Sequence, residues 1–205
     1  MMRVVAYIDG FNLYFGLKES SQRKYYWLDL HALATALLKP GQTLTAVHFF
    51  TTRIRDNGHN APDRQRQNMY LDALAERGVS IHEGHYLRKT RQCRQCGATW
   101  DDYEEKMTDV NIATKMLCDA QDDLFDVALL ISGDSDLTSP VQLVRSRFPA
   151  KRVIIAFPPK RHSAELKKFA HGFLTIGLDK LRASQLPVQV PTRRGHILHR
   201  PKEWQ

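Results

Sequence analysis

Strand-like and helix-like segments alternate along this 205-residue chain, and this order restricts the possible folds more than any other feature of the sequence. Segments rich in β-branched and apolar residues and bounded by turn residues are typical of strands. They run from Arg3 to Ile8, Leu44 to Thr51, Val79 to Tyr86, Val127 to Ser132 and Arg152 to Phe157. Segments with helical periodicity lie between them: Leu13 to Lys18, Asp29 to Leu38, Pro62 to Arg77, Glu104 to Ala120, Ser135 to Arg147 and Ala164 to Ala170.

The strand that begins at Val127 is apolar on both faces, which is typical of a buried strand in a parallel sheet. Together with the alternating order, this predicts an α/β fold, in which a largely parallel, Rossmann-like sheet is flanked by helices on both faces as a three-layer α/β/α arrangement. Ligands of such sheets bind beyond the carboxyl ends of the strands. We therefore expect the functional residues to follow strands.

The length suits one domain with a sizeable core. Helical periodicity stops at Leu186, where the proline-containing stretch Pro187 to Gly195 begins. We therefore predict a domain over residues 1–185 and a basic C-terminal tail over residues 186–205. Such a tail is either a mobile chain end or an arm that contacts phosphate groups.

The net charge of +8 and the isoelectric point near 9.5 favour an anionic partner. The sequence separates the charges, because Trp100 to Asp126 is mainly acidic and Arg145 to Lys168 is mainly basic. No apolar run approaches the roughly 18 residues of a membrane span. The segment Arg3 to Ile8 also lacks the pattern of a secretory signal, so we expect a cytoplasmic protein that does not contact membranes.

Three aspartates follow two of the predicted strands. Asp9 ends the first, and Asp134 and Asp136 follow the strand that begins at Val127. Gly10 and Gly133 lie beside two of these carboxylates and allow a close approach of the backbone. A single aspartate after a strand often only caps the next helix, but three of them at two strand ends favour a site.

A fourth aspartate, Asp109, lies in the segment with helical periodicity from Glu104 to Ala120. It is three and seven residues from Ile112 and Met116, so it shares the apolar face of the helix. A carboxylate there is partly buried and needs a cation, a hydrogen-bond network or a metal. A lysine or arginine of the core is the alternative partner. Glu105 would share this helical face, or simply be solvated.

Several carboxylates that meet at the end of a parallel sheet form a site for Mg²⁺ or Mn²⁺, because these hard cations prefer oxygen ligands. A bound ion of this kind activates water and stabilises charge on a phosphoryl oxygen. The sequence therefore predicts phosphodiester hydrolysis.

Three segments resemble, in order, the successive motifs of bacterial NYN domains: Tyr7 to Tyr14, Glu104 to Asn111 and Ser132 to Leu137. The similarity extends from about residue 3 to residue 177. It implies a PIN-like fold and metal-dependent ribonuclease activity, with an acidic set that serves catalysis and metal binding. That set is Asp9, Asp109, Asp134 and Asp136. Asn12 and Ser132 match polar positions that support the metal or the phosphate.

The leading hypothesis is an endoribonuclease that acts on single-stranded or loop RNA. A catalytically silent nucleic-acid-binding or regulatory module is one alternative, and a nuclease that acts on DNA is another. The acidic set favours an enzyme, because a binding module gains little from negative charge beside a polyanion. A homo-oligomer is left open.

Cys93 and Cys96 form one Cys-x-x-Cys pair, which is half of a structural zinc site. His82 and His85 precede it at a compatible spacing. A pair of reduced thiols in a loop is the alternative. We expect the third cysteine, Cys118, to be a small core residue.

Lys160 and Arg161 follow the strand Arg152 to Phe157 and are the candidates for phosphate contacts, with Ser163 as the cap of the next helix. An ordinary basic turn explains them equally well. The aromatic run Tyr25 to Trp27 could stack bases, although we expect core packing for at least two of the three. The arginine-flanked loop from Arg53 to Arg66 is either a flap near the substrate or a solvated loop.

Overall fold

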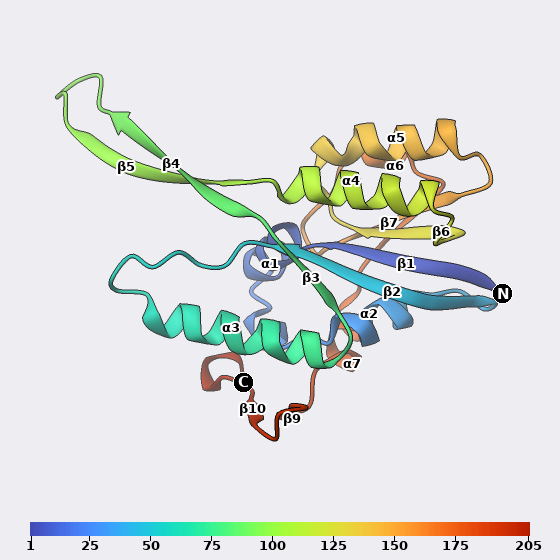
Figure 1. Ribbon diagram of the computed structural model, residues 1–205, viewed down its shortest axis with the longest axis horizontal. Helices are drawn as coiled ribbons and strands as arrows, with labels where there is room; N and C mark the ends of the chain where they lie inside the picture. The colour runs from blue at the N-terminus through green and yellow to red at the C-terminus, as the bar shows by residue number, and fades with distance from the viewer.

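The computed structural model describes residues 1–205 and confirms the three-layer α/β/α fold (Figure 1). The strands are β1 (Met2–Asp9), β2 (Gln42–Thr51), β3 (Ser80–Glu83), β4 (His85–Gln92), β5 (Thr99–Lys106), β6 (Val127–Ile131), β7 (Arg152–Phe157), β8 (Gly172–Thr175), β9 (Gln189–Pro191) and β10 (Ile197–His199). The helices are α1 (Gly10–Glu19), α2 (Leu30–Ala36), α3 (Ala61–Glu76), α4 (Thr108–Gln121), α5 (Thr138–Arg147), α6 (Ala164–Phe169) and α7 (Leu178–Ala183).

The central sheet has six strands in the order β3-β2-β1-β6-β7-β8, and every neighbouring pair is parallel. The order reverses beside β1, so the chain leaves β1 on one side and returns to the sheet at β6 on the other. This is the point at which an open parallel sheet forms a ligand crevice. The pairing of Ile8 with Ile131 brings Asp9 and Ser132, the next residues, side by side.

Two hydrophobic clusters hold the layers together. On one face of the sheet, Ile8 and its neighbours pack against α1, α2, α3 and α7. On the other face, Tyr7 and its neighbours pack against α4, α5 and α6. Because successive strand residues point to opposite faces, both clusters draw on the same strands. The apolar character of β1 and β6 on both faces follows from this arrangement.

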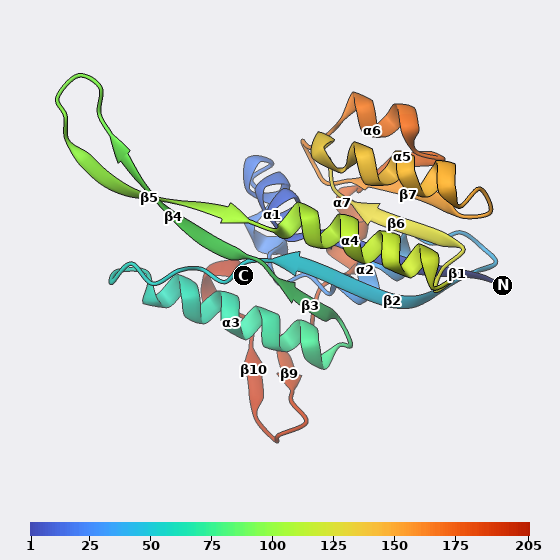
Figure 2. The same ribbon diagram turned by 45° about the horizontal axis from the view of Figure 1, so that its top comes forward.

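A two-stranded antiparallel arm, formed by β4 and β5, extends away from the body of the molecule (Figures 1 and 2). The prediction of one continuous strand from Val79 to Tyr86 is therefore wrong, because the structure has two strands there, β3 and β4. The segment is divided at Gly84, where the backbone N–H donates to the carbonyl of Thr51, and where a Cβ atom would lie 2.6 Å from the carbonyl oxygen of Lys106.

The predicted helix from Glu104 to Ala120 is wrong at its start. Residues 104–106 belong to β5, and α4 begins at Thr108, after Met107 turns the chain with a φ of 82°. Pairing across the arm outweighs the local helical periodicity. Lys89 and Lys106 both form ion pairs with Glu104. The acidic and basic segments of the sequence meet elsewhere, where Lys151 pairs with Asp123 at 2.6 Å.

The C-terminal residues pack on the domain. Strands β9 and β10 form a small hairpin, and Val190 is buried in the core. Trp204 lies against the rings of Tyr26, Trp27 and Tyr70. None of the helices combines the length and the apolar content that a membrane span requires.

Candidate active site

Asp9 lies at the carboxyl end of the central strand β1 and caps α1. One oxygen of its carboxylate accepts the backbone N–H of Asn12 at 2.9 Å, and the other accepts the hydroxyl of Ser132 at 2.8 Å. The side chain is buried, with an exposure of 3%. Gly10 allows this tight turn, because a Cβ atom there would lie 2.7 Å from the carbonyl oxygen of Phe50. The glycine beside Asp9 is therefore required by close packing.

Asp134 reaches the same place from β6, through a turn that the polar motif residues hold. The backbone N–H of Asp134 donates to the hydroxyl oxygen of Ser132 at 3.0 Å. The amide oxygen of Asn12 accepts the N–H of Gly133 at 2.8 Å. Asn12 and Ser132 thus join the ends of β1 and β6, so their observed contacts are with the backbone and side chains that position the two aspartates.

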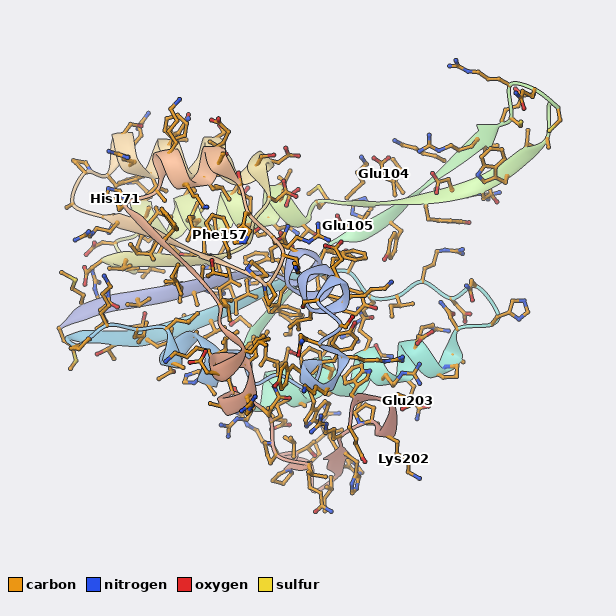
Figure 3. All side chains as sticks on the ribbon, turned by 180° about the vertical axis from the view of Figure 1, so that it is seen from behind. Glu104, Glu105, Phe157, His171, Lys202 and Glu203 are labelled. Carbon is orange, nitrogen blue, oxygen red and sulfur yellow. The ribbon has the colours of Figure 1, made fainter.

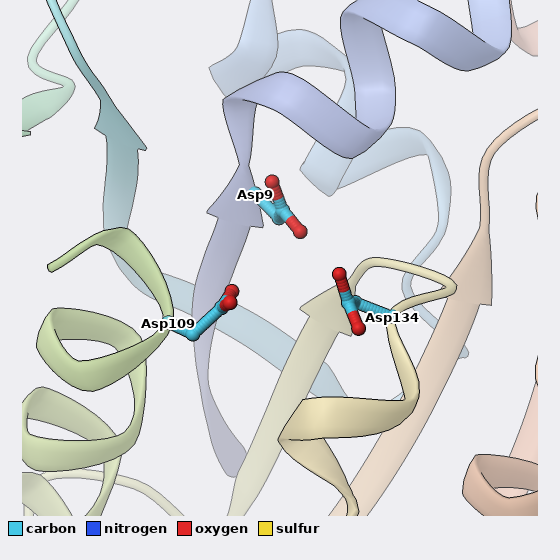
Figure 4. Close-up of side chains that lie close together, drawn as sticks. All are labelled: Asp9, Asp109 and Asp134. Atoms are coloured by element: carbon cyan, nitrogen blue, oxygen red, sulfur yellow. The ribbon is translucent and has the colours of Figure 1, made fainter. Parts of the chain in front are cut away.

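Asp109 lies in the first turn of α4, and its half-buried carboxylate points toward the other two (Figure 4). One carboxylate oxygen of each of Asp9, Asp109 and Asp134 lies within 4.8 Å of the others. No lysine, arginine or histidine forms an ion pair with any of these three carboxylates. The pairing of Asp109 with a core cation, which the sequence left open, does not occur.

The carboxylates are electrostatically uncompensated. Burial raises the pKa of Asp9 to about 6, and the charges of Asp134 and Glu105 add to this effect against the opposing hydrogen bonds of Asn12 and Ser132. Burial also raises the pKa of Asp109 to about 6, with further contributions from the neighbouring carboxylates, Asp9 first. A divalent cation fits this donor set, because it supplies the missing positive charge and prefers oxygen ligands. Asp9, Asp109 and Asp134 are the residues that would hold it.

We expect cation binding to weaken steeply in mild acid, because protons compete for the same oxygens. The carboxyl groups of Asp9 and Asp109, with pKa values of about 6, are ionised at pH 7 and protonated at pH 5. Between pH 6 and pH 5 the ionised fraction of each such carboxyl falls about fivefold, so affinity should fall by about fivefold to thirtyfold, depending on whether one or both protons must be displaced. Calorimetric Mn²⁺ titrations would measure this, and an affinity that stays constant over this range would contradict the site.

Asp136 and Glu105 lie outside the group of three. Asp136 is exposed, and its backbone N–H donates to Asp134 at 3.0 Å. Its charge still contributes to the raised pKa of Asp109. Glu105 lies at the base of the arm (Figure 3) and accepts hydrogen bonds from the backbone and hydroxyl of Thr108. It approaches the cluster from β5 and not, as predicted, from a helical face shared with Asp109.

The loop after β7 lies at the same edge as the aspartates. Gly133 packs against it so closely that a Cβ atom there would lie 2.9 Å from the carbonyl carbon of Arg161. Arg161 forms an ion pair with Glu19, whereas Lys160 is exposed and makes no ion pair. Ser163 caps α6 as predicted, by accepting the N–H of Leu166 at 3.2 Å.

A cleft of about 770 Å³, which none of the three aspartates lines, was not predicted. Gly10 lines it next to Asp9, and its walls include Tyr14, Tyr26, Tyr70 and Trp204, with basic groups from Lys18, Arg23 and Arg66. Tyr25 and Trp27 are buried in the core, which confirms the expectation for two of the three residues in this aromatic run. The wall residues come from distant segments, so no local pattern could have identified the cleft.

The arginines of the loop between β2 and α3 and of the start of α3 have partners within the protein, and Arg66 pairs with both Asp63 and Glu203. Arg53 pairs with Glu83, and Arg64 pairs with Asp56. The guanidinium of Arg55 lies 3.5 Å from the ring centroid of Tyr103. These contacts favour a structural explanation for the charge of this loop.

Cys93 and Cys96 lie at the tip of the arm and not beside the predicted histidines. His82 belongs to β3, where its ring pairs with that of His48 at 3.0 Å, and His85 begins β4 at the base of the arm. The ligand set with these histidines is therefore not assembled. Cys118 is exposed on α4, so its predicted place in the core is wrong.

Another buried carboxylate, that of Asp119, was not predicted. It accepts the hydroxyl of Tyr7 at 2.7 Å and pairs with Lys115 at 2.5 Å. The ring of His48 lies 3.7 Å away, and burial lowers the pKa of this histidine to about 4, which keeps it neutral at pH 7. Asp119 and Lys115 are four residues apart on one helix, and this spacing is the sequence signal that could have predicted their ion pair. This network is satisfied by its own partners, unlike the acidic cluster.

Comparisons with known proteins agree with this fold. Residues 3–179 match the NYN domain family. The 6-hydroxy-3-succinoylpyridine 3-monooxygenase HspA of Pseudomonas putida is 27% identical over 99% of this chain and 75% of its own length. A protein of unknown function from Vibrio parahaemolyticus has a crystal structure that matches 90% of this chain and 96% of its own with a TM-score of 0.57, at 21% identity.

The likeness to the Vibrio parahaemolyticus protein supports the fold alone. The family match supports more than the fold, because it spans nearly the whole chain. It includes β1, α4 and β6, the elements that carry the three aspartates. With a nuclease-like fold and an acidic cluster at the reversal point of its sheet, this chain belongs to the NYN domain family.

Proposed function

We propose that this protein is a metal-dependent endoribonuclease that hydrolyses phosphodiester bonds at the cluster of Asp9, Asp109 and Asp134. The observation that carries the proposal is the convergence of three carboxylates from β1, α4 and β6 with no cationic side chain to neutralise them. Such a cluster costs stability in the folded protein. Binding of a divalent cation would repay this cost and supply positive charge where a phosphate must approach.

Mg²⁺ or Mn²⁺ bound here would activate a water molecule and stabilise the charge that develops on the phosphoryl oxygens. Side chains of the protein hold the carboxylate ligands in place before an ion binds. Ser132 fixes the orientation of the Asp9 carboxylate, and Asn12 fixes the turn at Gly133 that carries Asp134. In this proposal the exposed Asp136 would orient water around the ion. Each of these groups is held before substrate arrives, which lowers the cost of assembling the site.

The substrate that we propose is single-stranded or loop RNA. The aromatic side chains of the cleft, which Gly10 lines next to Asp9, offer surfaces on which an unpaired base can stack, and Lys18 and Arg23 offer charge to its phosphates. A duplex would keep its bases inside the stack and away from this cleft. The preference for RNA over DNA comes from the family resemblance.

Cleavage of oligonucleotides tests the proposal. RNA and DNA of one sequence, each as a single strand, a hairpin and a duplex, would be incubated with Mg²⁺, Mn²⁺ or EDTA. We expect cleavage of the RNA single strand and of the hairpin loop with either metal, and none with EDTA. Binding without cleavage in every metal would favour the silent module, and faster cleavage of DNA would favour the alternative nuclease.

Lys160 and Arg161 should contribute to RNA affinity and not to the chemical step. Their loop packs against Gly133 at the edge that carries the aspartates, so a phosphate near the cluster would pass them. On single strands each phosphate contact contributes about 0.7 to the slope of log affinity against log salt. Replacing both residues by alanine should therefore reduce the slope by about 1 to 1.4 and leave the rate at saturating RNA nearly unchanged.

A charge-matched control is available in Arg147 and Arg152, which are exposed at the opposite end of β7. Replacing both by alanine changes the net charge equally but should leave the salt slope much closer to that of the wild type. Equal slopes for the two double variants would show that Lys160 and Arg161 act only through net charge, and the substrate path would then have to lie elsewhere.

A second candidate function rests on the same cleft. The Pseudomonas putida relative is named for a monooxygenase reaction on 6-hydroxy-3-succinoylpyridine, and a cleft walled by Tyr26, Tyr70 and Trp204 suits a planar ring. Calorimetry with this compound separates the two functions. Saturable binding that Tyr26→Ala weakens, in a protein that cleaves no RNA, would favour the small-molecule function.

A further inference from the structure

The arm formed by β4 and β5 lacks the packing that normally stabilises a hairpin. Most of its side chains are exposed, and both Leu87 and Trp100 keep about half of their surface in solvent, at 46% and 51%. An isolated two-stranded hairpin is marginally stable in water. Ion pairs across the strands, such as Arg88 with Asp101 and Arg91 with Asp102, are exposed and contribute little. The tip of the arm therefore needs a further source of order.

The backbone at the tip of the arm turns tightly after Cys93. The turn is closed by the N–H of Cys93 to the carbonyl of Ala98 at 2.8 Å, and by the N–H of Gly97 to the carbonyl of Cys93 at 2.9 Å. Gly97 has a φ of 73°, which favours glycine. Two cysteines separated by two residues in such a turn can bind one metal ion together through their thiolates.

Two thiolates fill only half of a tetrahedral zinc site, and closed structural sites need four ligands. The nearest predicted histidine, His85, is paired with Lys106 at the base of the arm, while the tip pair is Gln92 with Thr99. Seven residues of extended strand span about 23 Å, so His85 cannot reach the tip. The acidic cluster is the only group of three or more potential ligands within the chain. The remaining ligands must come from outside this chain.

We propose that the arm tips of two copies of this chain bind one Zn²⁺ between them, with Cys93 and Cys96 of each copy as its four thiolate ligands. Four thiolates and one Zn²⁺ carry a net charge of −2. The exposed Arg94, which has no ion-pair partner and lies between the two cysteines in the sequence, offers one compensating positive charge from each copy. Trp100, paired across the arm with Arg91 near the tip, would lie close to the second copy, and tryptophan is enriched in such interfaces.

Native mass spectrometry of the full chain, purified without chelator or added metal, tests the proposal. We expect a dimer that contains one Zn²⁺, which is half an equivalent per chain. Removal of zinc with a strong chelator should give monomers, and added Zn²⁺ should restore the dimer. Co²⁺ in place of zinc should produce the thiolate-to-metal absorption of a tetrahedral four-sulfur site, which a carboxylate site cannot produce.

The variant Cys93→Ser/Cys96→Ser should be monomeric and lose this absorption, whereas Cys118→Ser should behave as the wild type. Because the tip is exposed, circular dichroism should show that both variants retain the fold. A monomer with one zinc per chain bound by Cys93 and Cys96 would overturn the shared site. So would a Cys93–Cys96 disulfide in the freshly purified protein, zinc-free thiols that alkylate freely, or a dimer that survives both chelation and the double substitution.

Discussion

Replacing Asp9 by asparagine should abolish RNA cleavage and at the same time stabilise the metal-free protein. The loss of one ligand charge weakens the binding of a divalent ion by several kcal/mol. About 4 kcal/mol of lost transition-state stabilisation corresponds to a thousandfold lower rate. We therefore expect a loss of at least about a thousandfold. The measurement is the single-turnover cleavage rate of an RNA oligonucleotide in saturating Mn²⁺, beside thermal unfolding in EDTA.

The stabilising effect follows from the raised pKa of Asp9. Its pKa is about 6 in the folded protein and near 3.9 in an unfolded chain, so the folded state binds the proton more tightly. The ionised carboxylate therefore costs stability above pH 6, and the cost disappears as the pH falls below about 4. The shift of about two pKa units means that the ionised carboxylate costs about 3 kcal/mol of stability, which the asparagine removes. The asparagine also removes one hydrogen-bond acceptor, which costs about 1 kcal/mol.

The metal-free variant should therefore unfold a few degrees above the metal-free wild type at pH 7. At pH 4 the difference should largely disappear, because the wild-type carboxyl is then protonated. The addition of Mn²⁺ should raise the melting temperature of the wild type and have little effect on the variant. A variant that cleaves RNA at the wild-type rate, or a wild type that Mn²⁺ does not stabilise, would contradict the assignment of Asp9 as a ligand.

Replacing Asp119 by alanine should have the opposite effect on stability. This substitution leaves the buried hydroxyl of Tyr7 without its acceptor and separates Lys115 from its partner. An unsatisfied buried hydroxyl costs about 1–3 kcal/mol, and the cavity left by the side chain adds to this cost. We expect the free energy of unfolding to fall by about 2–4 kcal/mol, measured by urea denaturation.

Cleavage per folded molecule should remain close to that of the wild type, because Asp119 lies ten residues from Asp109 on α4, which is about 15 Å along the helix axis. Asp119→Asn is the matched control, since it keeps an acceptor for Tyr7 and should lose less stability. Combining Tyr7→Phe with Asp119→Ala should cost less than the sum of the two single changes. If Asp119→Ala were as stable as the wild type, the network would contribute nothing to the fold.

These two carboxylates show what separates a structural acid from a candidate ligand. Both are buried acids beside β1, but Asp119 has a hydroxyl donor and an ammonium partner, whereas Asp9 has only neutral donors. From sequence, Asp119 carries no distinguishing mark apart from Lys115 four residues away. Asp9 is marked by its place after a strand and by the glycine that follows it.

The parallel sheet and the meeting of Asp9 with Asp134 could be predicted because both depend on local patterns. Apolar strands specify the buried sheet, and the carboxyl ends of parallel strands share an edge. Asp109 could be predicted for a related reason, since its spacing from Ile112 and Met116 fixes the helical face on which it lies. Family resemblance added the proposed chemistry.

The arm could not be predicted, because its pairing depends on contacts between strands and not on periodicity. The segment around Glu104 reads as helix when taken alone, and its strand conformation follows from its pairing with β4. The cleft beside Asp9 was missed for a similar reason, since Tyr14, Tyr70 and Trp204 are far apart in the sequence. The exposure of Cys118 depends on which face of α4 the core covers at its C-terminal end.

The most direct test of the account is anomalous diffraction from crystals grown with Mn²⁺. We predict one strong manganese peak at the carboxyl edge of the sheet, within about 2.2 Å of carboxylate oxygens from Asp9 and Asp134, with Asp109 bound to the same ion directly or through water. The same experiment on Asp9→Asn should show the peak lost or much weakened. Manganese bound only elsewhere, with these three carboxylates in contact with protein cations or solvent alone, would contradict the central claim.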